Sequence, residues 1–131
     1  FQKLVTEEAI LFQEFMNNII LKGEASLIMI GGKYSHAVKK IAKKGDFRVQ
    51  DDHGGKVEKY EAKAREIKFA ETCIKKCPFP PLYSRVDIVY DNKEQLALME
   101  LELIEPELWF RNNPGSAILL AQEVFNLISS R

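Results

Sequence analysis

The sequence is poor in the residues that mark secreted, zinc-bound or membrane-embedded proteins. Its only cysteines are Cys73 and Cys77, and it has two histidines and one tryptophan. A CxxxC spacing without a second ligand pair argues against zinc and favours reduced thiols in a cytoplasmic protein. No apolar run reaches the roughly 18 residues of a membrane span, so no membrane association is expected. The first residues lead into Glu7 and Glu8 and do not resemble a signal peptide.

The chain also lacks net charge, because 19 Lys and Arg balance 19 Asp and Glu. This balance argues against a general nucleic-acid binder, although a local basic patch remains compatible with it. The length of 131 residues fits one domain with a real core. Because the chain starts at Phe1 without Met, within what reads as an element, we expect residues 1–131 to be a single domain cut from a longer protein.

What the sequence does contain predicts an α+β fold, a mainly antiparallel sheet of about five strands packed by two helices. The expected strands are 10–15, 26–30, 34–38 and the two arms of a hairpin at 82–105. Gly31 and Gly32 are expected to form a hairpin turn, and residues 45–55 are expected to form a loop. The expected helices are 57–76 and one that begins near 113–116. The second should bury Ile118, Leu119, Ala121, Val124, Phe125 and Ile128.

The hairpin carries three carboxylates where apolar side chains would be less costly: Asp87, Glu100 and Glu102. Residues two apart on a strand share a face and lie about 7 Å apart. A turn near Asn92 brings Asp87 beside the glutamates. Three acids on one face repel each other, and a divalent cation bound through oxygen relieves that repulsion. The alternative is a solvated face of an antiparallel sheet.

Several segments, in this order and spacing, resemble the ATP-grasp carboxylate–amine ligases. The resemblance is to the glutathione-synthetase-like, ribosomal-protein-S6-modification-like and D-cycloserine-ligase-like members. The segments are 13–15, Gly23–Glu24, 45–48 with Gly54–Gly55, 85–87 and 100–102. The resemblance covers residues 11 to about 128 but only about the second half of the family's catalytic unit. It implies that this chain is the C-terminal part of an ATP-grasp domain and does not turn over alone.

The resemblance implies that ATP is the cofactor and that five residues contact it. Three form the hinge strand beside the adenine: Gln13, Glu14 and Phe15. Glu24 would accept hydrogen bonds from the ribose hydroxyls, and Lys39, or its neighbour Lys40, would face the phosphates. Core packing remains an alternative role for Phe15, and a lysine-rich solvated edge remains one for Lys39.

The resemblance also assigns the catalytic and metal residues. Arg48 lies in the loop that would close over the site, and Arg85 would face the transferring phosphoryl group. Asp87, Glu100 and Glu102 match the ligands of Mg²⁺, with Mn²⁺ as the alternative ion. Glu102 is a departure, because the family commonly has asparagine there.

The implied function is an ATP- and Mg²⁺-dependent ligase that joins a small-molecule carboxylate to an amine or similar nucleophile through an acyl phosphate. Two alternatives remain open: a kinase of the same fold that phosphorylates a hydroxyl, and a non-catalytic nucleotide-binding or scaffold module. An exposed edge strand near Phe12 would allow two copies to pair as a homodimer.

Overall fold

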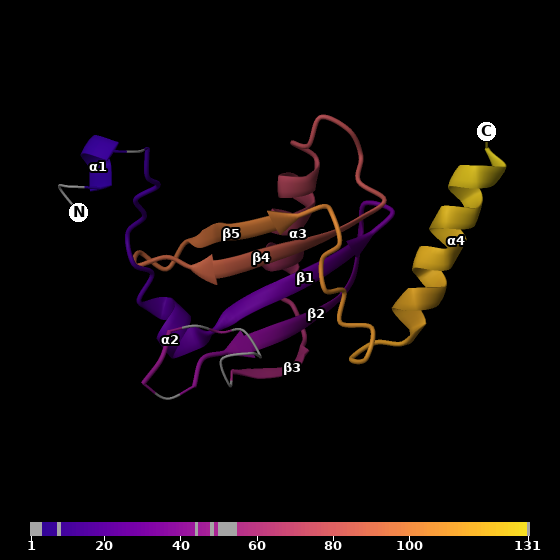
Figure 1. The fold of residues 1–131 in the computed structure, drawn as a ribbon. Coiled ribbons are helices and arrows are strands. Elements are labelled where there is room, and N and C mark those ends of the chain that lie inside the picture. Colours follow the sequence, from indigo (N-terminus) through magenta and orange to yellow (C-terminus); the bar gives the residue numbers. More distant parts are fainter. Residues whose placement is uncertain (1–3, 8, 44, 48, 50–54, 131) are drawn as a thin grey trace.

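A computed structural model describes residues 4–7, 9–43, 45–47, 49 and 55–130. In these residues, five strands form one antiparallel sheet in the order β3-β2-β1-β4-β5 (Figure 1). The strands are β1 Glu24–Ile30, β2 Lys33–Ile41, β3 Lys56–Tyr60, β4 Tyr83–Tyr90 and β5 Leu96–Glu102. The helices are α1 Leu4–Glu7, α2 Asn18–Lys22, α3 Ala64–Ile74 and α4 Gly115–Ser129. The predicted α+β class is confirmed.

Strand β1 is the centre of the sheet, and all seven of its residues are buried. Its side chains alternate between the faces, as strand geometry requires. Leu27 and Met29 pack with Ala70 of α3 on one face. Ile28 packs with Trp109 on the other. Each such apolar side chain contributes roughly 1.5–3 kcal/mol on burial, which explains why the most apolar run of the sequence occupies the middle strand.

Both predicted hairpin turns are present. The Gly31–Gly32 turn joins β1 to β2, and both glycines have positive φ. The turn between β4 and β5 is closed by a hydrogen bond of 2.8 Å from the Asp91 amide to the Gln95 carbonyl. The Asp91 carboxylate accepts from the Lys93 and Gln95 amides, each at 2.8 Å. These contacts fix the register of the acid-bearing hairpin.

Two of the predicted elements are wrong. Residues 10–15 form no strand, and Leu11 and Phe12 are exposed. The predicted edge for a homodimer is therefore not formed in the described chain. The predicted helix over 57–76 forms only from Ala64, because Lys56–Tyr60 pairs with β2 as strand β3. Ladder hydrogen bonds to β2 outweigh the helix propensity of this short charged segment.

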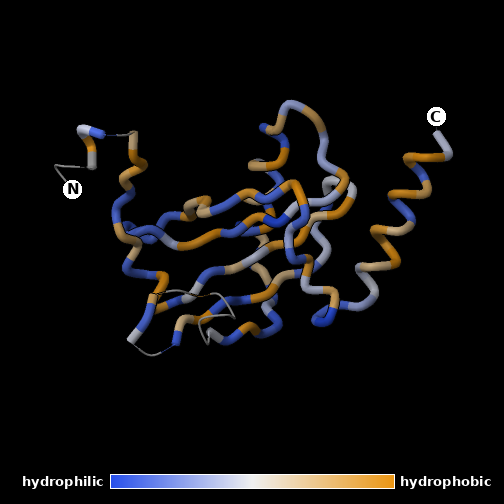
Figure 2. Tube along the Cα trace, viewed as in Figure 1, coloured by the Kyte–Doolittle hydropathy of each residue, from blue (hydrophilic) through white to orange (hydrophobic). Residues whose placement is uncertain are grey.

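The predicted buried face of α4 is also wrong for this chain. Helix α4 projects from the end of the sheet (Figure 1), and hydrophobic residues recur along its length (Figure 2). Five of the six residues expected to be buried are large apolar side chains that are exposed: Ile118, Leu119, Val124, Phe125 and Ile128; the sixth, Ala121, is exposed too. Only Ser116 is fully buried, and Leu120 packs on the core. No described helix is long and apolar enough to cross a membrane.

Candidate functional site

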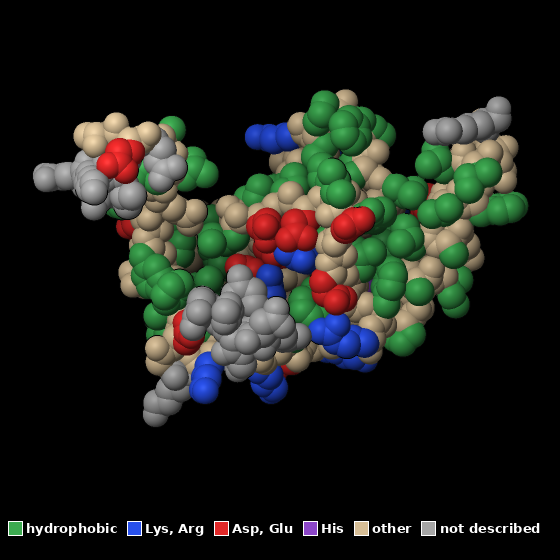
Figure 3. Space-filling view, viewed as in Figure 1, with side chains coloured by type: hydrophobic (Ala, Val, Ile, Leu, Met, Phe, Trp, Pro, Cys, Tyr) green, Lys and Arg blue, Asp and Glu red, His purple; other side chains and the backbone are tan. Residues whose placement is uncertain are grey.

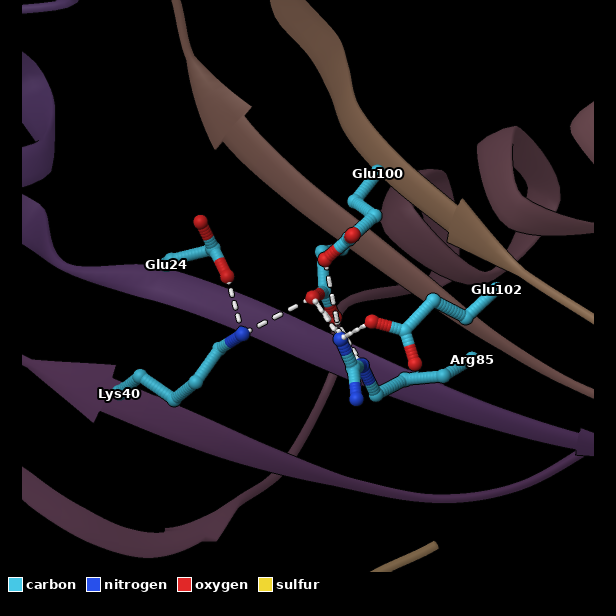
Figure 4. A network of polar contacts seen from close by, with 6 residues as sticks. Glu24, Lys40, Arg85, Glu100 and Glu102 are labelled. Atoms are coloured by element: carbon cyan, nitrogen blue, oxygen red, sulfur yellow. Dashed lines mark hydrogen bonds and ion pairs between the residues drawn. The ribbon is translucent and has the colours of Figure 1, made fainter. Parts of the chain in front are cut away.

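Six charged side chains from four strands gather on the face of the sheet opposite α3 (Figure 4). We call them the acid cluster: Glu24, Lys40, Arg85, Asp87, Glu100 and Glu102. The register explains the gathering, since Glu24 pairs with Lys40, Asp87 with Glu100, and Arg85 with Glu102. A cavity of about 500 Å³ is lined by Met99 and by every member except Asp87. Red carboxylates with blue side chains beneath them mark this surface in Figure 3.

Lys40 is the cation of the buried half of the cluster. Its Nζ donates to Asp87 Oδ2 at 2.8 Å and forms an ion pair with Glu24. The Lys40 and Asp87 side chains are only 8% and 1% exposed. Burial lowers the pKa of Lys40, but the carboxylates of Asp87 and Glu24 outweigh burial and raise it. Burial raises the pKa of Glu24, and the negative charge of Asp87 raises it further, while the ammonium of Lys40 lowers it without cancelling the rise.

Arg85 is the cation of the more open half. Its Nε lies 3.1 Å from both carboxylate oxygens of Asp87, and its Nη2 donates to Glu100 Oε2 at 3.0 Å and to Glu102. Burial lowers the pKa of the guanidinium, but these carboxylates raise it above its usual value. Arg85 and Asp87 share a face because they are two apart on β4, as the sequence predicts.

A β-bulge shapes the wall of the cavity at β5. Asp87 pairs with Glu100 and Ile88 pairs with Leu98, so Met99 is an extra residue on β5. A bulge of this kind redirects a side chain that alternation would place on the opposite face. Met99 and Glu100 therefore both line the cavity although they are adjacent in sequence. The sequence alone does not predict this position for Met99.

The residues present fit a divalent cation. Four carboxylates face two cations in the cluster, which leaves two negative charges in excess. In the described part of the chain no three acids, histidines or cysteines are arranged as a finished metal site. The physical reason is that Arg85 and Lys40 lie between the carboxylates. The Glu100 and Glu102 side chains are 55% and 30% exposed, so both have room to turn toward an ion.

The carboxylate chemistry supports the same conclusion. Burial raises the pKa of Glu100, and the nearby charge of Glu102 raises it further, while Arg85 opposes the rise. An added cation would stabilise the ionised form of both groups. All the donors are hard oxygen atoms, the ligands that Mg²⁺ prefers.

The predicted adenine residues lie beside the β4–β5 hairpin. The Asn92 side-chain amide donates to Glu14 Oε1 and to the Phe15 carbonyl, both at 2.9 Å. Gln13 Nε2 lies 3.8 Å from the sulfur of Met99, which lines the cavity. The Phe15 ring meets the Phe47 ring edge-on at 5.6 Å. The structure thus brings residues 13–15 to the β5 side of the cavity, outside the sheet.

The structure separates the two candidate lysines. Lys40 joins the acid cluster, whereas Lys39 lies on the opposite face of β2, with its ammonium 5.2 Å from the centre of the Tyr60 ring. Alternation along β2 and the pairing of Lys40 with Glu24 explain the difference. Glu24 lies in the cluster, paired with Lys40, and its predicted contact with the ribose hydroxyls stays a prediction. Arg48 lies outside the described residues.

Comparisons with known proteins agree with this fold. A family model described as a RimK-like ATP-grasp domain matches residues 2–108. The chain is similar to D-cycloserine synthetase DcsG, with 24% identity and a TM-score of 0.64, over 86% of this chain and 40% of that one. It is also similar to the ATP-grasp ligase PsnB, solved with a phosphomimetic variant of its minimal precursor, Mg and ADP. That match has 16% identity and a TM-score of 0.54, over 76% of this chain and 33% of PsnB.

The chain therefore spans less than half the length of these two structures. At such identities the likeness establishes the fold. No curated protein matches the sequence.

Proposed function

Since the chain belongs to the RimK-like ATP-grasp family, we propose that its acid cluster is the metal- and phosphate-binding floor of an ATP-dependent ligase. The observation that carries the proposal is the charge balance around the cavity. Among the described residues, the four carboxylates of the cluster pair with only two cations, Lys40 and Arg85, and all four except Asp87 line the cavity. An excess of two negative charges at a cavity favours the entry of a divalent cation together with its phosphate partner.

Asp87, Glu100 and Glu102 are the proposed ligands of Mg²⁺, with Mn²⁺ as a substitute. When bound, the ion would neutralise charge on the phosphate oxygens during phosphoryl transfer. Asp87 is held by Arg85 and Lys40 and provides the fixed oxygen donor. The more exposed Glu100 and Glu102 provide donors that adjust to the ion.

Arg85 is the proposed catalytic cation. Its Nη2 reaches Glu100 and Glu102 at the surface of the cavity. A substrate carboxylate that attacks the γ-phosphorus gives an acyl phosphate and ADP, and an amine then displaces phosphate and loses a proton. Negative charge develops on non-bridging oxygens in both steps, and a guanidinium fixed at the cavity wall stabilises such charge. No protein nucleophile is required.

The nucleotide-binding roles of Gln13, Glu14, Phe15, Glu24 and Lys39 remain predictions, as does the closing role of Arg48. The Phe15 and Phe47 side chains, 46% and 54% exposed, offer an aromatic surface near the hairpin for a purine ring. Lys40, which lies in the cluster, is a better candidate than Lys39 for the phosphates. Small-molecule carboxylates and amines are the proposed substrates.

The test is Mg²⁺-dependent ADP release by the full-length protein, screened over small carboxylates with hydroxylamine as the nucleophile. Glu100→Gln should reduce ADP release by about 100-fold or more, a loss of the size found when one charge-stabilising group is removed. Glu71→Gln, on α3 and away from the cluster, is the matched control. A hydroxamate with free phosphate supports the ligase, and a phosphorylated hydroxyl product supports a kinase instead. Full ADP release by Glu100→Gln would refute the metal assignment.

A further inference from the structure

A second cavity, of about 520 Å³, lies at the open edge of β2 where β3 ends. Four consecutive residues of β2, from Tyr34 to Ala37, line it. The other lining residues are Lys59, Tyr60, Glu61, Asn112 and Asn113. Ile28, which packs with Trp109, lies between His36 and Arg85 in the same cross-strand row. The second cavity is thus separate from the acid cluster.

A β-bulge gives this cavity its polar wall. Ile28 pairs with His36 and Met29 pairs with Tyr34, so Ser35 is an extra residue on β2. The bulge places the side chains of Ser35 and His36 within 3.2 Å of each other. Both reach Ser116 in the first turn of α4: Ser35 Oγ lies 2.7 Å from Ser116 Oγ, and Ser116 Oγ lies 3.0 Å from His36 Nδ1.

The proton positions in this group follow from its partners. His36 Nε2 lies 3.0 Å from the Leu108 carbonyl, which only accepts, so Nε2 carries the proton and Nδ1 accepts. Burial lowers the pKa of His36, which keeps the ring neutral. One hydroxyl donates to Nδ1 and the other donates to its neighbouring hydroxyl. Both hydroxyl hydrogens are then used within the group, and Ser35 offers the cavity only lone pairs.

The rest of the lining adds acceptors. Asn112 Oδ1 is buried and has no hydrogen-bond partner in the described part of the chain. A buried acceptor without a partner is costly, and such a group calls for a donor from water or a ligand. Glu61 and Lys59 are exposed at the rim, and no ion pair among the described residues joins them. The lining of the cavity therefore combines the Ser35 hydroxyl and the Asn112 side chain with the Glu61 carboxylate and the Lys59 ammonium.

This arrangement favours a small molecule over an added peptide strand, because a bulge disrupts the regular edge that a strand would need. We propose that the β2-edge cavity binds a small amino acid as its zwitterion. The ligand ammonium donates to Asn112 Oδ1 and Ser35 Oγ and faces Glu61. The ligand carboxylate faces Lys59. The proposal does not depend on the function proposed for the acid cluster.

Calorimetric titration of the full-length protein without nucleotide tests the proposal, with glycine, methylamine and acetate as probes. Glycine should bind at millimolar concentrations and more tightly than methylamine, and acetate should bind most weakly. Asn112→Leu should weaken glycine binding by about tenfold or more, the loss expected for one hydrogen bond to a charged group. Lys59→Gln should weaken glycine binding but leave methylamine unchanged, and Lys68→Gln on the exposed side of α3 should change neither.

Thermal melting of each variant confirms that it is folded. Acetate binding without methylamine binding would overturn the proposal, since it would assign an anion site. Glycine binding that Asn112→Leu leaves unchanged, or no glycine binding in the folded wild-type protein, would overturn it as well.

Discussion

Lys40→Met removes the buried ammonium of the acid cluster while it keeps a long apolar side chain of similar shape. Asp87 loses one partner but keeps its two bonds of 3.1 Å to Arg85. Glu24 loses its only ion pair among the described residues and is almost fully buried. The variant therefore leaves one buried carboxylate without a cation.

Breaking a buried ion pair in this way costs about 3–5 kcal/mol. Because Arg85 still compensates Asp87, we expect the lower end, about 3 kcal/mol, in the free energy of unfolding. A protein of this size loses roughly 3–4 °C of melting temperature per kcal/mol, so the melting temperature should fall by about 10 °C. Fluorescence of Trp109, the only tryptophan and a buried one, reports unfolding in urea.

Two further variants isolate the cause. Glu24→Gln in the Lys40→Met background removes the uncompensated charge and should recover about 1–2 kcal/mol. Lys39→Met changes the adjacent lysine, whose contact is the face of Tyr60 on the other side of the sheet, and should cost about 1 kcal/mol or less. An uncompensated Glu24 carboxylate is excluded as the cause if Lys40→Met costs no more than Lys39→Met, or if Glu24→Gln destabilises the Lys40→Met variant further.

Two more predictions concern the backbone of the sheet and its pH response. Gly23→Ala should lower the free energy of unfolding by roughly 2–3 kcal/mol, because Gly23 has a φ of +71° and an added Cβ would lie 2.5 Å from the Lys40 carbonyl oxygen on β2. Gly32→Ala should lower it by only about 1 kcal/mol in the same urea assay, because Gly32 has a φ of +74° but no atom within 4 Å of the added Cβ. Burial lowers the pKa of His36 from its ordinary value of 6.5, so the unfolded chain binds a proton on this ring more readily than the folded chain does. The contribution of His36 to the free energy of unfolding is therefore full above about pH 6.5 and is lost as the pH falls below it. The stability difference between wild type and His36→Gln should therefore shrink from about pH 7.5 to about pH 5.5, and a constant difference would contradict this.

The acid-bearing hairpin could be predicted from the sequence because its signals are local. Two apolar runs flank a turn of Asp91 and Asn92, and the period of two along each strand places Arg85 beside Asp87. The predicted proximity of Asp87 and Glu100 is confirmed as a direct cross-strand pair. What the local pattern does not contain is the bulge that brings Met99 to the cavity.

The wrong predictions for residues 10–15, residues 56–60 and α4 have a common cause: each depends on contacts between elements, which the local sequence does not contain. Lys56–Tyr60 has the composition of a helix but becomes a strand because β2 offers a free edge. Residues 10–15 have the composition of a strand but pair with no strand of the described chain, although β5 is an open edge of the sheet. The apolar residues of α4 predict a buried face, but no described element covers it. Lys40 lies in the cluster because it pairs with Glu24 across β1 and β2, and this register depends on the position of the turn between the two strands.

Electron paramagnetic resonance of Mn²⁺ with ADP and the full-length protein tests the central claim most directly, because it counts bound ions at the acid cluster without requiring a substrate. We predict that the wild-type protein binds Mn²⁺ with ADP, that Glu100→Gln weakens binding by about tenfold or more, and that Glu102→Gln weakens it measurably. Glu71→Gln should bind as the wild type does. Mn²⁺ binding that is equally strong in Glu100→Gln and Glu71→Gln would contradict the assignment of the acid cluster as the metal site.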